Sequence, residues 1–367
     1  MKTNLLQKNI PKDWSVKKIK DLLKFEQPTK YIVERSSYAS NGKTPVLTAN
    51  KSFVLGYTNE TNGVYTDTPA IIFDDFTTDS KYVDFPFKIK SSAIKILKSK
   101  DENTDLKFVY EIMKSFAFPI ANHKRHYISQ YQELDIVIPP IKEQKKIAEI
   151  LSSVDKEIQK VEEIISKTEK FKKGLMQDFL KNNKNLKFFD LESLCLSITA
   201  GGDLPDNYNK EQKNPTEEFP YPIYSNGIED KALYGFTNNY KIENSAITIS
   251  ARGTIGYHVI RKAKFTPIIR LITLIPNEEI VSIYYLNYVL DNVKINYSSS
   301  GIPQLTVPNV KKLKIPVVSI IEQKKLSNTV LSVDKKILIS KNLRENLILL
   351  KKGLVSDLLS GNKRVKI

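Results

Sequence analysis

The chain repeats itself at a fixed offset of 179 residues, and this repeat limits its possible folds more than any other feature. Three tetrapeptides recur at that offset: EQKK at 143–146 and 322–325, SVDK at 153–156 and 332–335, and KKGL at 172–175 and 351–354. A fainter match has the same offset, with LGYTN at 55–59 and YGFTN at 234–238. We interpret the chain as two copies of one unit, each with a diverged body and a retained carboxy-terminal segment.

The retained segments have the heptad pattern of long helices. In the first copy, apolar residues alternate in steps of four and three, interrupted at Lys172: Ile147, Leu151, Val154, Ile158, Val161, Ile165, Thr168, Leu175 and Phe179. The second copy begins in the same way, slips by one residue after Ile337, and then resumes: Leu326, Val330, Val333, Ile337, Leu343, Leu347, Leu350 and Leu354. We therefore expect an irregularity in the second helix. Two ordinary core helices are the alternative, but about 40 residues is unusually long for them.

The connectivity of the chain limits the arrangement of these parts. A helix of about 40 residues is roughly 60 Å long, so the first helix carries the chain far from the first body. If the second helix packs on the first, it must run back antiparallel. We expect an α+β fold, with two mixed α/β bodies at opposite ends of a long antiparallel two-helix coiled coil and an approximate two-fold repeat. The expected segments are body one (1–137), helix one (138–184), body two (185–314) and helix two (315–367).

The charge of the chain favours a polyanionic partner such as nucleic acid. Lysine and arginine total 57 against 41 acidic residues, a net charge of +16. The excess is uneven, because 315–367 carries 11 basic and 4 acidic residues while 185–314 carries 14 and 13. Any recognition of nucleic acid by the nearly neutral second body must therefore depend on a few placed side chains.

Cysteine and histidine are scarce in this chain. The single Cys195 and three histidines exclude an internal disulfide and argue against a zinc site. No apolar run is long enough to span a membrane, and the amino-terminal residues lack a signal-peptide core. We expect a soluble, cytoplasmic protein with no membrane partner.

In the second body, SARGTIGYH at 250–258 predicts a glycine-flanked turn after a strand. Arg252 in this turn could donate two hydrogen bonds to guanine, with Ser250 and Thr254 beside it. A plain surface hairpin is an equally good interpretation. The segment SSSG at 298–301 with Gln304 resembles a flexible loop suited to groove contact, or a simple linker.

In the first body, NHKRHYIS at 122–129 places Lys124 and Arg125 in a candidate phosphate or base contact, and a solvated loop is the alternative. The pair Asp74-Asp75 is followed by Thr77, but adjacent strand carboxylates point to opposite faces, which disfavours a metal site. Asp75 could accept a hydrogen bond from a base amino group, although ordinary polarity at a strand end is favoured.

Motifs for catalysis are missing from the sequence. It contains no GxGxxG, no GxxxxGK[ST] and no Asn/Asp-Pro-Pro-aromatic motif. Asp135 followed by Glu143-Gln144-Lys145 matches an acidic-x-Lys nuclease pattern, but the repeat at 322–324 suggests instead the first turn of a helix. We therefore expect no catalytic residues and no metal.

The order of a body, then IPP or IPV, then EQ, then a heptad helix ending in KKGL, repeated once, resembles the specificity subunit of type I restriction-modification systems. The strongest marks are IVIPPIKEQKKIAEILSSVDKEI at 136–158 and LKIPVVSIIEQKKLSNTVLSVDKKI at 313–337. The resemblance implies that each body reads one half of a split DNA target through the turns and loops described above. It also implies that the helices set the spacing between the half-sites and dock two methyltransferase subunits.

Further implications of the resemblance concern partners and cofactors. S-adenosylmethionine would bind to the methyltransferase subunit and no cofactor to this chain, and a motor-endonuclease subunit could join the complex. Spacer and partner roles would fall on the helix residues Glu143, Gln144, Asp155, Glu322, Gln323 and Asp334. Two alternatives remain open: a recognition subunit of a methyltransferase-only or type II-like system, and a coiled-coil scaffold that does not bind DNA.

Overall fold

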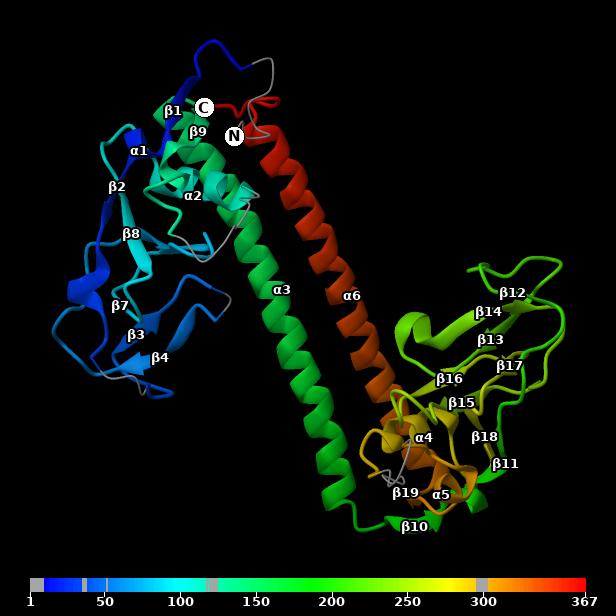
Figure 1. The fold of residues 1–367 in the computed structure, drawn as a ribbon. Helices are drawn as coiled ribbons and strands as arrows, with labels where there is room; N and C mark the ends of the chain where they lie inside the picture. The colour runs from blue at the N-terminus through cyan, green and yellow to red at the C-terminus, as the bar shows by residue number, and fades with distance from the viewer. Residues whose placement is uncertain (1–9, 35–37, 51, 117, 119–124, 295–302) are drawn as a thin grey trace. The chain divides into compact units, whose positions relative to one another are not determined.

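The computed structural model describes residues 10–34, 38–50, 52–116, 118, 125–294 and 303–367. The chain forms two compact units (Figure 1). The first unit comprises Met1–Glu163 and Lys341–Ile367, and the second comprises Ile164–Ser340. The division falls inside both long helices, α3 (Ile141–Asn182) and α6 (Ile320–Leu359). The boundaries that we predicted separate bodies from helices, so they remain a prediction.

The first unit contains two sheets, one strand pair and two short helices. The four-stranded antiparallel sheet has the order β2 (Leu23–Glu26), β8 (Ile94–Ser99), β5 (Ala70–Asp74) and β6 (Ser80–Val83). The smaller sheet has the order β4 (Val54–Thr58), β3 (Thr44–Leu47) and β7 (Lys88–Ile89). The remaining elements are β1 (Ser15–Lys18) paired with β9 (Asp135–Ile138), α1 (Ile19–Leu22) and α2 (Leu106–Ser115).

The second unit repeats this plan. Its four-stranded antiparallel sheet has the order β11 (Cys195–Ala200), β18 (Ile272–Pro276), β15 (Ala246–Ile249) and β16 (His258–Arg261). The second sheet has one strand more than its counterpart in the first unit, and its order is β12 (Tyr208–Asn209), β14 (Leu233–Thr237), β13 (Tyr221–Tyr224) and β17 (Thr266–Pro267). The remaining elements are β10 (Lys187–Asp190) paired with β19 (Lys314–Val317), α4 (Ile283–Leu290) and α5 (Val307–Lys311).

The two units also share their strand register. Ile71 lies opposite Leu97 in the first unit, and Ile247 lies opposite Leu274 in the second. The mixed α and β class, the two long helices and the internal repeat that we expected are therefore confirmed.

The faint LGYTN and YGFTN match has a structural reason. A Cβ atom on Gly56 would lie 2.5 Å from the Tyr38 Cβ, and one on Gly235 would lie 2.5 Å from the Asn209 carbonyl oxygen. Any larger residue would push the neighbouring segment away from β4 or β14. Both copies therefore keep glycine at this position.

The heptad seam of α6 corrects one expectation. Leu343 and Leu350, which we placed on the seam after a slip, are 47% and 52% exposed. The less exposed residues instead continue in steps of four and three without a slip: Leu326, Val330, Val333, Ile337, Ser340, Arg344, Leu347, Lys351, Leu354 and Leu358. These positions are the seam of α3 displaced by 179 residues, with Lys351 matching Lys172. The expected slip was wrong because polar residues occupy seam positions that we required to be apolar.

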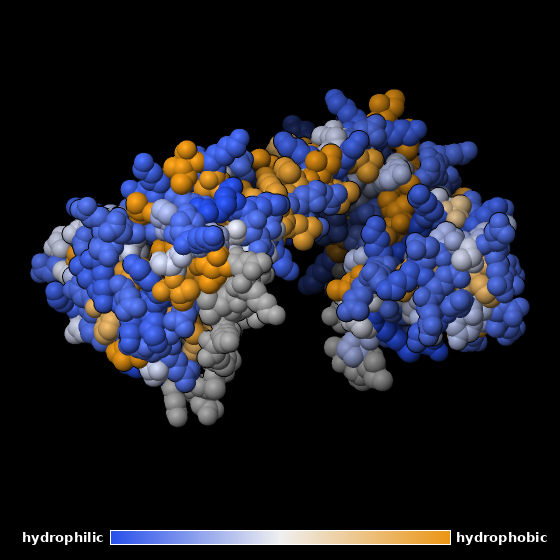
Figure 2. Space-filling view, turned by 90° about the horizontal axis from the view of Figure 1, so that it is seen from above, coloured by the Kyte–Doolittle hydropathy of each residue, from blue (hydrophilic) through white to orange (hydrophobic). Residues whose placement is uncertain are grey.

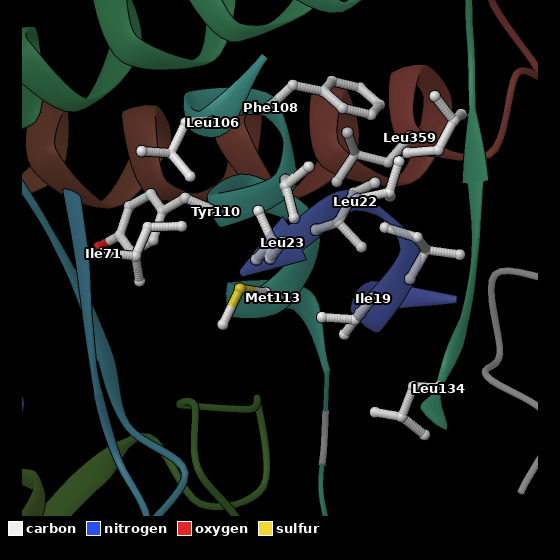
Figure 3. Packing of buried hydrophobic residues seen from close by; sticks show 14 of the residues in the cluster. Ile19, Leu22, Leu23, Ile71, Leu106, Phe108, Tyr110, Met113, Leu134 and Leu359 are labelled. Atoms are coloured by element: carbon white, nitrogen blue, oxygen red, sulfur yellow. The ribbon is translucent and has the colours of Figure 1, made fainter. Parts of the chain in front are cut away.

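Parts of both long helices complete the core of each unit. In the first unit, Leu359 of α6 lies in the cluster that contains Phe108 of α2 and Ile147 of α3 (Figure 3). In the second unit, Met176 of α3 and Val330 of α6 belong to one cluster. Each large apolar side chain that is fully buried contributes about 1.5–3 kcal/mol to folding. The bodies are thus anchored to the helices by continuous apolar packing.

Candidate nucleic-acid interface

The turn after β15 presents a polar group at the surface of the second unit. Ser250 N–H donates to the Tyr257 carbonyl at 2.8 Å, and Gly256 N–H donates to the Ser250 carbonyl at 3.0 Å. Gly253 and Gly256 have φ of 68° and 88°, a region that favours glycine. Arg252 and Thr254, both predicted to contact DNA, are exposed in this turn.

Arg252 contacts a second residue that we had predicted separately. Its Nη2 donates to Oε1 of Gln304 at 3.0 Å, across 52 residues of sequence. The backbone fixes this contact, because Leu305 N–H donates to the Ala251 carbonyl at 3.0 Å. A guanidinium and an amide therefore stand side by side, and both groups can bind base edges in the major groove.

Ser250 plays a different part. It is 1% exposed, and its Oγ accepts a hydrogen bond from Gly227 N–H at 3.3 Å. Ser250 thus stabilises the turn from its buried side. The expectation that Ser250 contacts DNA directly therefore requires correction. The predicted loop at 298–301 lies outside the described residues.

In the first unit, the turn after β5 lies beside the loop that contains Arg125. The carboxylate of Asp74 accepts from Phe76 N–H at 2.9 Å and from Thr77 N–H at 3.0 Å, which shapes the turn. Phe76 and Thr77 are exposed, and the Arg125 guanidinium lies 5.9 Å from the centre of the Phe76 ring. Two predicted sites therefore meet, while Lys124 lies outside the described residues.

The prediction for Asp75 requires correction as well. Asp75 is 1% exposed, its Oδ1 accepts from Tyr127 N–H at 2.9 Å, and its Oδ2 lies 3.4 Å from Lys95 Nζ. This carboxylate holds the Arg125 loop against the sheet and does not face solvent. The strand-end interpretation that we favoured describes its neighbour Asp74.

The two turns occupy equivalent positions in their units. His126 N–H donates to the Asp75 carbonyl at 2.8 Å, just as Leu305 N–H donates to the Ala251 carbonyl. The residues beside these bonds are Phe76 with Arg125 in the first unit and Arg252 with Gln304 in the second. Sequence reasoning had not singled out Phe76, although an exposed aromatic residue directly after a buried strand could have indicated it.

The predicted helix residues have mostly internal partners. Oε1 of Gln144 accepts from Asp105 N–H at 2.8 Å, and its Nε2 donates to the carbonyls of Asn103 and Pro139 at 2.9 Å. Gln323 makes the matching set with Ser282 N–H and the carbonyls of Ile280 and Val318, at 2.9–3.0 Å. Both amide side chains are buried and join the start of the helix to the body. The expectation that they face a partner subunit therefore requires correction.

The two first-turn glutamates differ from each other. Glu143 is fully buried and accepts from Trp14 Nε1 at 3.1 Å and from Arg364 at 2.7 Å. Glu322 is partly exposed and forms a capping box with Ser319, whose hydroxyl donates to it at 2.7 Å. This hydrogen bond holds the pKa of Glu322 below its usual value. Only Glu322 therefore remains available to a partner.

The repeated SVDK and KKGL motifs pair with each other. In the second unit, Lys172 Nζ donates to Asp334 Oδ1 at 2.7 Å. In the first unit, Lys351 Nζ donates to Asp155 in the same way. The aspartate of each SVDK motif thus binds the first lysine of the other copy's KKGL motif. We call these two ion pairs the helix clasps.

The clasps have different surroundings. Asp155 also lies 3.3 Å from Lys114, and the buried Glu111 lies 3.2 Å from Lys351. Burial opposes ionisation of Asp155, but the two lysines outweigh it and lower its pKa. In the second unit, the Tyr288 hydroxyl donates to Asp334 at 2.9 Å. Each clasp therefore joins both helices and the body of its unit.

Within the described residues, no group of three or more histidine, cysteine or acidic side chains could hold a metal ion. Over the same residues, no helix combines the length and apolar character needed to cross a membrane.

Comparisons with known proteins agree with this geometry. Residues 11–170 and 183–348 match the family described as the type I restriction modification DNA specificity domain. The specificity subunit of type I restriction enzyme EcoR124I/EcoR124II from Escherichia coli is 48% identical over 145 residues, which are 37% of this chain and 36% of that protein. A putative type I specificity subunit from Mycoplasma pneumoniae is 30% identical over 202 residues, 54% of each chain. The matches thus span about a third and about half of these relatives.

A solved structure supports the fold along the whole chain. The crystal structure of a type I restriction-modification system S subunit from M. genitalium has a TM-score of 0.71 at 20% identity, and the match covers 98% of this chain and 99% of that one. At this identity the likeness shows the fold alone. The family match covers both repeats, and the chain therefore belongs to the family of the type I restriction modification DNA specificity domain.

Proposed function

We propose that this chain is the DNA sequence-specificity subunit of a type I restriction-modification complex. Each body reads one half of a bipartite target in double-stranded DNA, and the bases between the halves are spanned without being read. The chain positions its partners on DNA and performs no catalysis. The cytoplasm is the proposed location.

The equivalent turns carry this proposal. Both units hold an exposed turn on the same backbone hydrogen bond, but they display different side chains there. Arg252 with Gln304 offers donors and an acceptor side by side, while Phe76 with Arg125 offers an aromatic face and a cation. One frame with two chemical faces is what reading two different half-sites requires.

The helices supply a surface for partner subunits. Apolar side chains gather over the long helices (Figure 2), and α6 exposes Leu343, Leu349 and Leu350 in the first unit and Leu338 and Ile339 in the second. Exposed apolar patches of this kind are typical of protein interfaces. We assign this surface to two methyltransferase subunits, which would carry S-adenosylmethionine and flip an adenine out of the duplex for methylation. A motor-endonuclease subunit is a further proposed partner.

Mapping of methylated bases tests the proposal. Cells that express the chain with its methyltransferase subunit should contain one bipartite motif with a methylated adenine in each half. A coiled-coil scaffold without DNA binding predicts no motif, and that result would refute the proposal. A methyltransferase-only or type II-like system would give the same motif without restriction of unmodified DNA.

Arg252→Ala and Arg125→Ala form a matched pair for this assay. Arg252→Ala should relax one base pair in one half-site by about 1–3 kcal/mol of discrimination, because it removes a bidentate donor. Arg125→Ala should affect only the other half-site. If either variant changed both halves, the bodies would not read independently.

Exchange of whole segments separates reading from spacing. Replacement of residues 186–314 by the corresponding body of a relative should change one half of the motif only. Insertion of one heptad into both helices should lengthen the spacer and leave both halves intact, since the helices set the distance. An unchanged spacer would contradict the role of the helices.

A further inference from the structure

The layer between the two sheets differs in character between the units. In the first unit, Leu47, Ile72, Val83 and Ile96 are fully buried there and belong to one apolar cluster. The strand registers assign their equivalents in the second unit as Tyr224, Thr248, Arg261 and Thr273. A polar layer thus replaces an apolar one.

Arg261 is the charged member of this layer. It is 3% exposed, its Nε donates to Thr248 Oγ1 at 2.9 Å, and its guanidinium lies 3.8 Å from the centre of the Tyr224 ring. Among the described residues, no carboxylate lies within ion-pair distance of it. Loss of solvent lowers the pKa of Arg261. A buried cation without an anion is unfavourable for stability, and an apolar residue serves in the other unit.

A second polar group in this layer, the Thr273 hydroxyl, has no hydrogen-bond partner. Thr273 lies directly opposite Thr248 in the sheet, and its buried Oγ1 makes no hydrogen bond. Buried hydroxyl groups are normally satisfied. A buried cation without a counter-ion and an unpaired hydroxyl group in one layer indicate that this part of the unit is adapted to something other than stability.

Arg261 lines a cavity of about 510 Å³ that opens at the surface. Tyr221 and Tyr224 form part of its wall, and Lys231, Lys262 and Lys264 also line it. Among the described lining residues, Asp230 is the only acidic one. Four cationic side chains against one carboxylate favour an anion in this cavity.

We propose that this cavity binds a phosphate group through the Arg261 guanidinium, with Lys262 and Lys264 adding positive charge at its edge. Guanidinium groups bind phosphate oxygens with paired hydrogen bonds, and a dry site strengthens the interaction. The phosphate comes either from the DNA backbone or from a free phosphate ion.

The position of the cavity separates it from the base-reading turn. Arg261 pairs with Ala246 at the start of β15, whereas Arg252 follows the end of that strand six residues later. The two sites therefore lie at opposite ends of β15. A backbone phosphate bound here would therefore fix the second unit on DNA without reading sequence.

Arg261→Met in the intact chain tests the site, with Lys187→Met as the control. Lys187 is exposed in β10 of the same unit and has no part in the cavity. Binding to a duplex of arbitrary sequence is measured as a function of salt, and binding of inorganic phosphate is measured by calorimetry without DNA. Thermal unfolding of both variants reports whether they fold.

If the cavity binds a phosphate of the DNA backbone, Arg261→Met should weaken duplex binding about 10-fold and reduce the salt slope by about one. Lys187→Met should change the affinity and the salt slope less. Arg261→Lys should restore part of the slope. If the cavity instead binds a free phosphate ion, calorimetry should detect binding of inorganic phosphate to the unmodified chain, and Arg261→Met should abolish it. The salt slope of duplex binding should then be the same for both proteins. In both cases Arg261→Met should melt no lower than the unmodified chain, because a buried charge has been removed.

One result overturns the proposal. The proposal is refuted if Arg261→Met leaves phosphate binding, duplex affinity and the salt slope unchanged. A lower melting temperature of that variant would then show that Arg261 is a structural residue. This outcome differs from a failure of the proposed function, which is judged by the methylated motif. The calorimetric arm does not depend on DNA reading at all.

Discussion

The two units use the same frame and differ in what they place on it. Sheet order, strand register, the buried glutamine at the start of each long helix and the helix clasp agree between them. The exposed turn and the layer between the sheets differ. The comparison teaches that the repeated sequence motifs belong to the frame, while the residues that we propose for recognition are ones that the two copies do not share.

Buried glutamines test the shared frame most severely. Gln144→Ala and Gln323→Ala should each lower the free energy of unfolding by about 3 kcal/mol, because each leaves one N–H and two carbonyls unsatisfied. Trp14, the only tryptophan, reports the first unit by fluorescence, and hydrogen exchange reports the second. Gln132→Ala, at a half-buried glutamine whose amide donates to the Ile128 carbonyl, is the control. Markedly unequal losses would show that the two frames are not equivalent.

First-turn glutamates should reveal the difference between the units. Glu143→Gln should lower the free energy of unfolding of the first unit by about 2 kcal/mol, because the buried carboxylate pairs with Arg364 and Trp14. Glu322→Gln should have a much smaller effect, since that side chain is partly exposed at a helix cap. Urea unfolding of both variants makes the comparison. Equal effects would mean that burial of Glu143 adds nothing.

The clasps should differ less strongly. Lys351→Met should cost about 2 kcal/mol, because it leaves the buried Glu111 with one lysine fewer. Lys172→Met should cost about 1 kcal/mol, since its partner Asp334 keeps the Tyr288 hydroxyl and is partly exposed. Double-mutant cycles with Asp155→Asn and Asp334→Asn measure the pair energies. A zero coupling energy in both cycles would exclude the clasps as stabilising contacts.

The smallest expected effect is a pH dependence confined to the second unit. Burial lowers the pKa of His258, but hydrogen bonds with Asp291 and the Gly256 carbonyl outweigh burial and raise it above 6.5. A raised pKa in the folded state means that this stabilisation is complete below the unfolded pKa and is lost as the pH rises through the folded value. Hydrogen exchange of β16 from about pH 6 to 8 should show the loss. Asp291→Asn should flatten the profile, and an unchanged slope would refute the assignment.

Much of the frame could be predicted from the repeat alone. The heptad pattern, present in both copies at the 179-residue offset, indicated both long helices. The polar seam residues Lys172 and Lys351 looked like interruptions in the sequence. Their partners lie in the other copy, more than 150 residues away, and no local pattern indicates that pairing.

The site was only partly predictable for the same physical reason. Arg252 and Gln304 were identified singly from their glycine-rich surroundings, but their contact depends on a backbone bond between distant segments. Asp75 was misjudged, since its burial depends on Lys95 and Tyr127, which pair with it only in the folded sheet. No pattern in the sequence singled out Arg261. Its unusual burial is evident only when the strand register shows that the equivalent residue in the first unit is Val83.

The first unit is formed by two separate segments of the chain, and this affects the order in which the units can fold during synthesis. The second unit is one continuous stretch, 164–340, whereas the first needs 341–367 to cover Ile147 and to bring Arg364 to Glu143. The early residues of the first unit therefore wait for 341–367, which are synthesised after the whole second unit. Until then the apolar face at the start of α3 stays uncovered on a growing chain, and exposed apolar surface of this kind favours aggregation. The half of the molecule that begins first is thus completed second.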